Sequence, residues 1–159
     1  MTMQGTATSV RTAITVEAPI EKAFSVFTDG MATWWPKENH IIEAELAEMV
    51  LEPRVGGRIF DRGVDGSECV WAHVLAYQPP TQFVFSWDIS SQWQIETDPE
   101  KTSEVVVTFV AETPQRTRVE LEHRKLDRHG EGWEQMRDSV GADQGWALGM
   151  TAFAAAAAA

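Results

Sequence analysis

Between residues 43 and 125 the sequence is a succession of short, strand-like segments joined by tight turns, and this feature limits the fold more than any other. Apolar and polar residues alternate within most segments, as in a β-strand with one buried face. Turns as short as Asp65-Gly66 and Pro79-Pro80 join antiparallel strands, because a parallel pair needs a long crossover. The segments predicted as strands are 9–17, 43–52, 57–62, 67–77, 82–89, 103–112 and 116–125.

Helical patterns flank this series. Pro19 suits the first turn of a helix in which Ile20, Ala23 and Phe27 share one face, and residues 31–36 (MATWWP) predict a second short helical turn. Near the other end, residues 131–140 predict a short helix and residues 142–159 a longer one. Only this last helix is long enough to cover one face of the sheet. We therefore predict an α+β fold in which a curved antiparallel sheet wraps around a long C-terminal helix.

Length and charge narrow the classes of function. A chain of 159 residues predicts one domain, here residues 9–158, after a disordered segment at residues 1–8. The net charge of −11 disfavours nucleic acid and anionic membrane surfaces as partners. Cys69 is the only cysteine, so no intramolecular disulfide can form. The sequence shows neither a signal-peptide pattern nor an apolar run of about 18 residues, which predicts a cytoplasmic protein without membrane insertion.

Several stretches, taken in order, resemble one known family. They are TVEAPIEKAFSVFTD (15–29), Trp34-Trp35-Pro36, EPRVGG (52–57), Asp65-Gly66, VLAYQPPTQFVFSW (74–87), SEVVVTFVAE (103–112), TRVELEH (117–123) and Gly145-Trp146. The order and spacing resemble the activator of heat-shock protein 90 ATPase homologue family, a member of the START-related, helix-grip (SRPBCC) superfamily. The resemblance implies a cavity between the sheet and the terminal helix, which in the superfamily holds lipids, steroids, polyketides or aromatic ligands. The resemblance does not identify a catalytic residue in this sequence.

Large aromatic residues supply the candidate binding site. Phe83, Phe85 and Trp87 share one face of a predicted strand, and simple alternation puts Trp71, His73 and Leu75 on one face of the preceding strand. Such residues can form a plain core, but seven tryptophans in 159 residues also suit a pocket. The predicted ligand-binding residues are Trp34, Trp71, His73, Phe85, Trp87, Trp146 and Met150, with Ser86 as a weaker polar candidate. Trp93, in the long connection 90–102, is placed to cover an opening.

The sequence contains few of the motifs that are typical of catalytic or metal-binding sites. It contains no Gly-x-Ser-x-Gly elbow, and Gly56-Gly57 neither open a helix nor precede a Walker lysine. Cys69 and His73 would be roughly 13 Å apart on a strand, too far to share a metal ion. We therefore predict no catalytic motif, metal or cofactor, and expect His73 and His123 to be core histidines unless one of them contacts a ligand.

Three functions remain open at this stage. The first is binding of a small hydrophobic or aromatic ligand, lipid-like or polyketide-like. The second is a cyclase or aromatase that uses the same cavity with His73 or an acidic residue as base. The third is regulation of a heat-shock-protein-90-type chaperone ATPase through the outer surface. The oligomeric state does not follow from the sequence.

Overall fold

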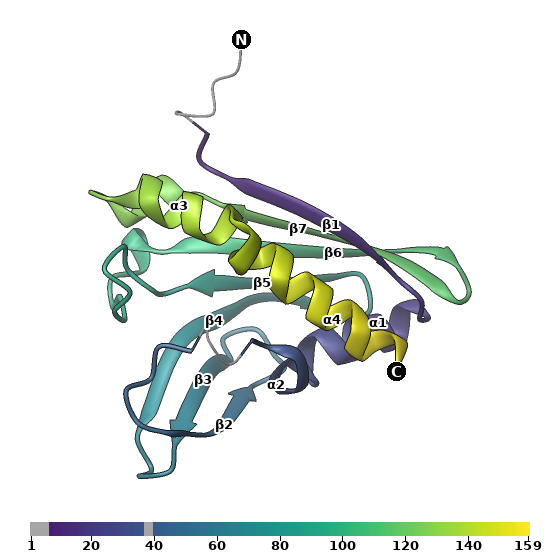
Figure 1. Cartoon of the computed structure of the whole chain (residues 1–159), viewed down its shortest axis with the longest axis horizontal. Helices are drawn as coiled ribbons and strands as arrows, with labels where there is room; N and C mark the ends of the chain where they lie inside the picture. Colours follow the sequence, from purple (N-terminus) through teal and green to yellow (C-terminus); the bar gives the residue numbers. More distant parts are fainter. Residues whose placement is uncertain (1–6, 37–39) are drawn as a thin grey trace.

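Seven antiparallel strands form one curved sheet in the computed structural model, which describes residues 7–36 and 40–159 (Figure 1). The strand order is β1-β7-β6-β5-β4-β3-β2, so every neighbouring pair except β1 and β7 is consecutive in the chain. The strands are β1 (Val10–Val16), β2 (Leu46–Leu51), β3 (Arg58–Gly63), β4 (Glu68–Gln78), β5 (Gln82–Trp87), β6 (Ser103–Thr113) and β7 (Arg116–Arg124). All seven predicted strands are confirmed, and with them the antiparallel sheet.

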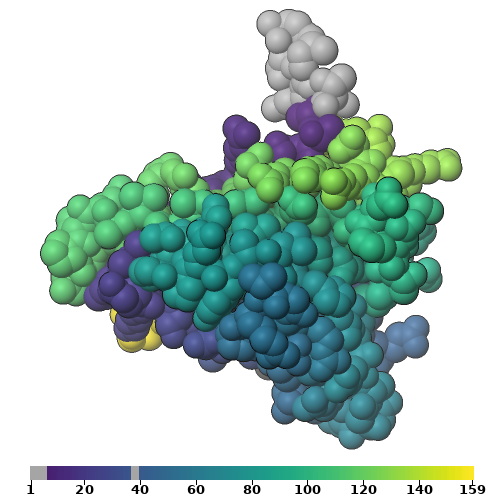
Figure 2. Space-filling model, turned by 180° about the vertical axis from the view of Figure 1, so that it is seen from behind, coloured from purple at the N-terminus to yellow at the C-terminus, as the bar shows by residue number. Residues whose placement is uncertain are grey.

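The helices lie against one face of this sheet. They are α1 (Ile20–Thr28), α2 (Met31–Trp34), α3 (Trp133–Gly141) and α4 (Leu148–Ala158). In Figure 1, α3 and α4 run diagonally across the sheet, and Figure 2 shows the opposite face, where the sheet hides almost all of α4. The helix-grip fold is therefore confirmed, with two short helices after the first strand.

The predicted long C-terminal helix is interrupted. A π-helical turn, Asp143–Ala147, joins α3 to α4, and Gly145 within it has non-helical backbone angles (φ −92°, ψ −127°). A β-carbon on Gly145 would lie 2.3 Å from the carbonyl oxygen of Val140, so only glycine allows the chain to pass this close to the end of α3. The bend turns Trp146 toward the sheet.

Aromatic rings fill the space between α4 and the central strands. The ring of Phe27, from α1, lies 5.1 Å from that of Phe153 on α4 and 6.2 and 5.8 Å from those of Phe83 and Phe109 on the sheet. All four side chains are buried, as are Val105 and Val107 beside them. The interior beneath the C-terminal half of α4 is therefore packed.

Strand β4 departs from simple alternation. Its register against β3 shifts between the pairs Ile59–Ala72 and Phe60–Val70, which leaves Trp71 as the extra residue of a β-bulge. Trp71 and Ala72 are consequently both buried, whereas His73 and Leu75 are exposed. The prediction that Trp71, His73 and Leu75 share one face is wrong, because a bulge inverts the alternation that follows it.

Charged side chains cover the face of the sheet that points away from the helices. Arg58 and Arg62 form ion pairs with Glu52, Glu48 and Glu68, as expected for surface residues. Of the predicted N-terminal disordered segment, residues 1–6 lie outside the described residues, and the carbonyl of Thr8 accepts a hydrogen bond from the backbone N–H of Leu126. No helix within the described ranges has the length and apolar character to cross a membrane.

Candidate functional site

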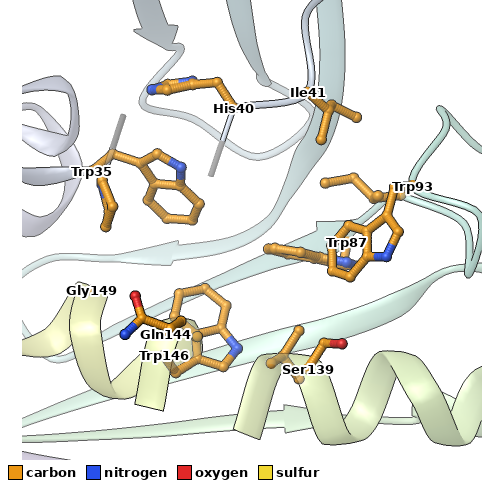
Figure 3. A pocket seen from close by; sticks show the side chains of 13 residues that line it. Trp35, His40, Ile41, Trp87, Trp93, Ser139, Gln144, Trp146 and Gly149 are labelled. Atoms are coloured by element: carbon orange, nitrogen blue, oxygen red, sulfur yellow. The ribbon is translucent and has the colours of Figure 1, made fainter. Parts of the chain in front are cut away.

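A cavity of about 380 Å³ opens where the start of α4 meets the end of β5 (Figure 3). We call it the pocket. Its walls come from the segment after α2, the end of β5 with the loop beyond it, and the α3–α4 junction. The lining residues are Trp35, Pro36, His40, Ile41, Trp87, Ile89, Trp93, Ser139, Val140, Gln144, Gly145, Trp146 and Gly149. The wall is therefore largely apolar, with a few polar groups.

Three indole rings form the floor and side of the pocket. The ring of Trp146 lies 5.7 Å from that of Trp35 and 5.6 Å from that of Trp87, in edge-to-face geometry with both. Trp71 lies behind them, 5.0 Å from Trp35 and 5.8 Å from Trp87. Because each ring contacts its neighbours, this wall is fixed before any ligand binds.

Trp93 is the fourth indole at the pocket. It lies in the loop after β5 and adopts a left-handed backbone conformation (φ 61°), which a tryptophan rarely takes. The bridge between Ile89 and Ile95 closes the base of this loop, and 44% of Trp93 is exposed. Figure 3 shows the ring beside Trp87 at the pocket. A large exposed apolar ring at an opening can close over a bound molecule.

A histidine–aspartate pair borders the opposite wall. His40 Nδ1 lies 2.7 Å from Oδ2 of Asp61, a β3 residue that is 1% exposed. The other carboxylate oxygen, Oδ1, is buried and has no hydrogen-bond partner among the described residues. An ionised carboxylate accepts the Nδ1 proton of a neutral imidazole, which leaves the lone pair of His40 on Nε2.

A second polar chain lies behind the indoles. Trp146 Nε1 donates to His123 Nδ1 over 3.1 Å, so the neutral His123 carries its proton on Nε2, 2.7 Å from Ser103 Oγ. The Ser103 hydroxyl in turn lies 2.7 Å from Nε2 of His129. Burial, with a smaller effect of the neighbouring His129, lowers the pKa of His123 to about 3, and burial also lowers the pKa of His129. Both rings are therefore neutral near pH 7.

Comparison with known proteins places this chain in a family. The family model described as "Activator of Hsp90 ATPase homolog 1-like protein" matches residues 17–158. The chain belongs to this family. None of the curated protein sequences compared with the chain matches it.

Solved structures of similar proteins include two with informative sequence identity. The anthrahydroquino-gamma-pyrone synthase Txn09 is 36% identical, with 93% of this chain and 96% of that chain covered and a TM-score of 0.66. The self-sacrificing resistance protein CalC from Micromonospora echinospora is 29% identical, with 94% of each chain covered and a TM-score of 0.66. The Aha1 dimer from Colwellia psychrerythraea, 15% identical over 94% of this chain and 96% of that chain with a TM-score of 0.60, supports the fold alone.

Two of the predicted site residues line the pocket, namely Trp87 and Trp146. Trp71 and Phe85 are buried behind the indole wall. Trp34 and Met150 are also buried in the core, where the indole nitrogen of Trp34 donates to the carbonyl of Val26. These four residues shape the wall without lining it.

His73 lies on the outer face of the sheet. Its Nδ1 is 2.8 Å from Asp88 Oδ2 and its backbone N–H donates to Ser86 Oγ, so these polar groups bind one another. Neither His73 nor Ser86 lines the pocket. The physical reason is the bulge at Trp71, which turns His73 away from the inside of the sheet.

Sequence reasoning missed three important lining residues. The sequence pattern favours Trp34, but α2 ends between Trp34 and Trp35 and turns the two rings to different surroundings, so that Trp35 lines the pocket. His40 stands in a segment without periodic pattern, and Gln144 is one of several polar residues at the start of the predicted terminal helix, so no signal in the sequence singles out either of them. The placement of Trp93 at an opening agrees with the prediction.

Proposed function

We propose that this protein binds a small, flat aromatic molecule in the pocket. The observation that carries the proposal is the convergence of four indoles, Trp35, Trp87, Trp93 and Trp146, on one cavity of about 380 Å³. This volume lies within the range of small-molecule sites. Fused aromatic rings suit the wall, because they stack on or meet the edges of indoles with little loss of conformational freedom.

The packed interior favours aromatic ligands over long lipids. An acyl chain needs a channel beneath α4, but Phe27, Phe83 and Phe153 fill that space. The name of one of the more similar solved proteins supports the same class, since that protein is an anthrahydroquino-gamma-pyrone synthase. A polycyclic, polyketide-like ligand therefore fits better than a fatty acid.

Titration with hydroxylated anthraquinones tests the proposal. We expect 2-hydroxyanthraquinone to quench tryptophan fluorescence, to release or absorb measurable heat in calorimetry and to raise the melting temperature, and palmitate to do none of these. The variant Gly149→Leu places a side chain at the pocket while keeping a good helix former in α4. It should remain folded and lose binding. The proposal fails if no anthraquinone in such a series binds the native protein.

Regulation of a chaperone ATPase remains a second prediction from the sequence. The family name supports it, and the outer charged face would have to carry it. Addition of the protein to a heat-shock-protein-90 homologue tests it, since a regulator changes the rate of ATP hydrolysis at saturating concentration. An unchanged rate, with anthraquinone binding intact, would leave ligand binding as the proposed function.

A further inference from the structure

We propose that His40, held by Asp61, is a general base that removes the proton from an acidic O–H group, phenolic or enolic, of the aromatic molecule in the pocket. This inference rests on the proposed binding function. It makes the protein capable of activating an aromatic hydroxyl as a nucleophile, and not merely of holding it.

The position of His40 is the first reason. Of the thirteen described residues that line the pocket, His40 alone has an imidazole, the side chain that most often serves as a general base in enzymes. Figure 3 shows it on the same side as Ile41, across the pocket from Ser139 and Gln144. A ligand stacked on the indoles would lie between these two sides. Among the described lining residues, this one imidazole therefore borders the space where the ligand would sit.

The orientation of the ring is the second reason. His40 Nδ1 is engaged by Asp61 at 2.7 Å, whereas Nε2 has no hydrogen-bond partner among the described residues. The side chain of His40 is 9% exposed, so the ring is held in place instead of moving freely in water. A carboxylate on Nδ1 fixes the tautomer with its lone pair on Nε2 and stabilises the imidazolium that forms when Nε2 takes a proton.

The burial of Asp61 is the third reason. Its side chain is 1% exposed, and Oδ1 lacks a partner in the described part of the chain. A buried carboxylate with an unused oxygen costs stability, and packing alone would favour an apolar residue there. Facing Asp61 across the β3–β4 ladder is Cys69, whose pKa is raised by burial and by the charge of Asp61. Apart from His40, the structure thus gives Asp61 no cationic partner within the described residues.

The step itself is a simple proton transfer. The ligand O–H bond breaks, its electron pair stays on the oxygen, and the proton forms a new bond with His40 Nε2. His40 becomes an imidazolium paired with Asp61, and the ligand becomes a phenolate or enolate beside it. No electrons are transferred, and the proton returns to solvent or to the product when the ligand leaves.

A probe whose colour reports its ionisation tests the step. Bound 2-hydroxyanthraquinone should ionise at lower pH than the free dye, with a ratio of phenolate to phenol at least about tenfold higher at the same pH, because an imidazolium would face the phenolate. His40→Gln, saturated with the dye as calorimetry shows, should lose this extra ionisation. His73→Gln, which removes an imidazole on the outer face, is the matched control and should retain it.

Asp61→Asn and a direct measurement on His40 complete the test. Asp61→Asn keeps a hydrogen-bond acceptor for Nδ1 but removes the charge, so the extra ionisation should fall below that of the native protein. In the native protein, the ¹⁵N chemical shifts of His40 should move from those of a neutral ring to those of an imidazolium when the dye is added. The inference is overturned if the dye binds but ionises as it does in water, or if His40 stays neutral. Absence of dye binding would instead overturn the proposed function and this inference with it.

Discussion

The indole nitrogen of Trp146 donates a hydrogen bond to Nδ1 of His123 over 3.1 Å, and both side chains are buried. This bond joins the pocket wall to a polar chain in the core, His123–Ser103–His129. It fixes the rotation of the Trp146 ring and uses its only polar atom. Trp146 can therefore offer a ligand only an apolar surface, and polar recognition must come from residues such as His40 and Gln144.

The first prediction concerns stability and pH. Because burial lowers the pKa of His123 from 6.5 to about 3, the folded protein keeps this ring neutral while the unfolded chain takes up a proton below about pH 6.5. The free energy of unfolding should be constant with respect to this group above pH 6.5 and should fall as the pH is lowered from there toward 3. The expected slope is about 1.4 kcal/mol per pH unit for one such group, with His129 acting in the same direction. Urea unfolding at several pH values between about 7.5 and 5 measures it.

The low pKa of Glu52 keeps its effect on stability outside the pH range of this measurement. The pKa of Glu52 is lowered to about 2 by its hydrogen bonds with Arg58, so its contribution is lost only as the pH falls below about 4.5. His123→Gln, which still offers an acceptor and a donor, should make the slope between pH 6.5 and 5 shallower than in the native protein. Equal slopes in the native protein and His123→Gln would show that His123 is not the group responsible.

The second prediction concerns Ser103, whose hydroxyl lies 2.7 Å from both His123 Nε2 and His129 Nε2. Ser103→Ala removes the partner of two buried nitrogens, and each unsatisfied group costs about 1–3 kcal/mol. We expect the free energy of unfolding to fall by about 2–4 kcal/mol in chemical denaturation. Ser91→Ala deletes a hydroxyl with one bond at an exposed site and should cost less than about 1 kcal/mol. A similar small loss in both variants would mean that water or rearrangement replaces Ser103.

Periodicity made much of the fold predictable, because β6 and β7 bury alternate residues along much of their length and the terminal segment has helical spacing. The prediction of buried faces from periodicity failed where a local feature shifts the alternation of inward and outward residues along a strand. The bulge at Trp71 inverts the rest of β4 and puts His73 outside, and nothing in the sequence around Trp71 marks it. The pairing of His40 with Asp61 joins residues 21 positions apart through the fold. This pair is visible only in the three-dimensional structure. The sequence alone therefore could not identify His40 as the proposed general base.

The third prediction concerns the two glycines at the junction of α3 and α4. A β-carbon on Gly145 would lie 2.3 Å from the carbonyl oxygen of Val140 and 2.6 Å from that of Ser139, both backbone atoms that cannot move aside easily. Gly145→Ala should therefore lower the free energy of unfolding by about 1–3 kcal/mol.

Gly149→Ala is the matched control for this position. Its β-carbon would lie 3.8 Å from the Trp34 ring and 4.0 Å from the Trp146 ring, which is ordinary contact, and alanine is favoured over glycine inside a helix by up to about 1 kcal/mol. Thermal unfolding should show a lower melting temperature for Gly145→Ala and an equal or higher one for Gly149→Ala. If Gly145→Ala is as stable as the native protein, the junction is looser than the close approach indicates.

The fourth prediction separates ligand binding from folding at Trp93. The residue has a left-handed backbone (φ 61°) and is 44% exposed, so Trp93→Gly relieves backbone strain but also removes an indole that is just over half buried. The free energy of unfolding should fall by about 1–3 kcal/mol, because the loss of buried apolar surface and the greater freedom of glycine in the unfolded chain outweigh the relief of strain, and the binding measurement is made at a temperature where both proteins are folded. The Kd for 2-hydroxyanthraquinone should rise about tenfold, since the ring that covers the pocket is lost. Calorimetry measures the Kd of both proteins without relying on tryptophan emission.

Trp133→Phe is the control, because it removes an indole outside the pocket lining, and it should leave the Kd unchanged. An unchanged Kd in Trp93→Gly would show that Trp93 does not cover the bound ligand.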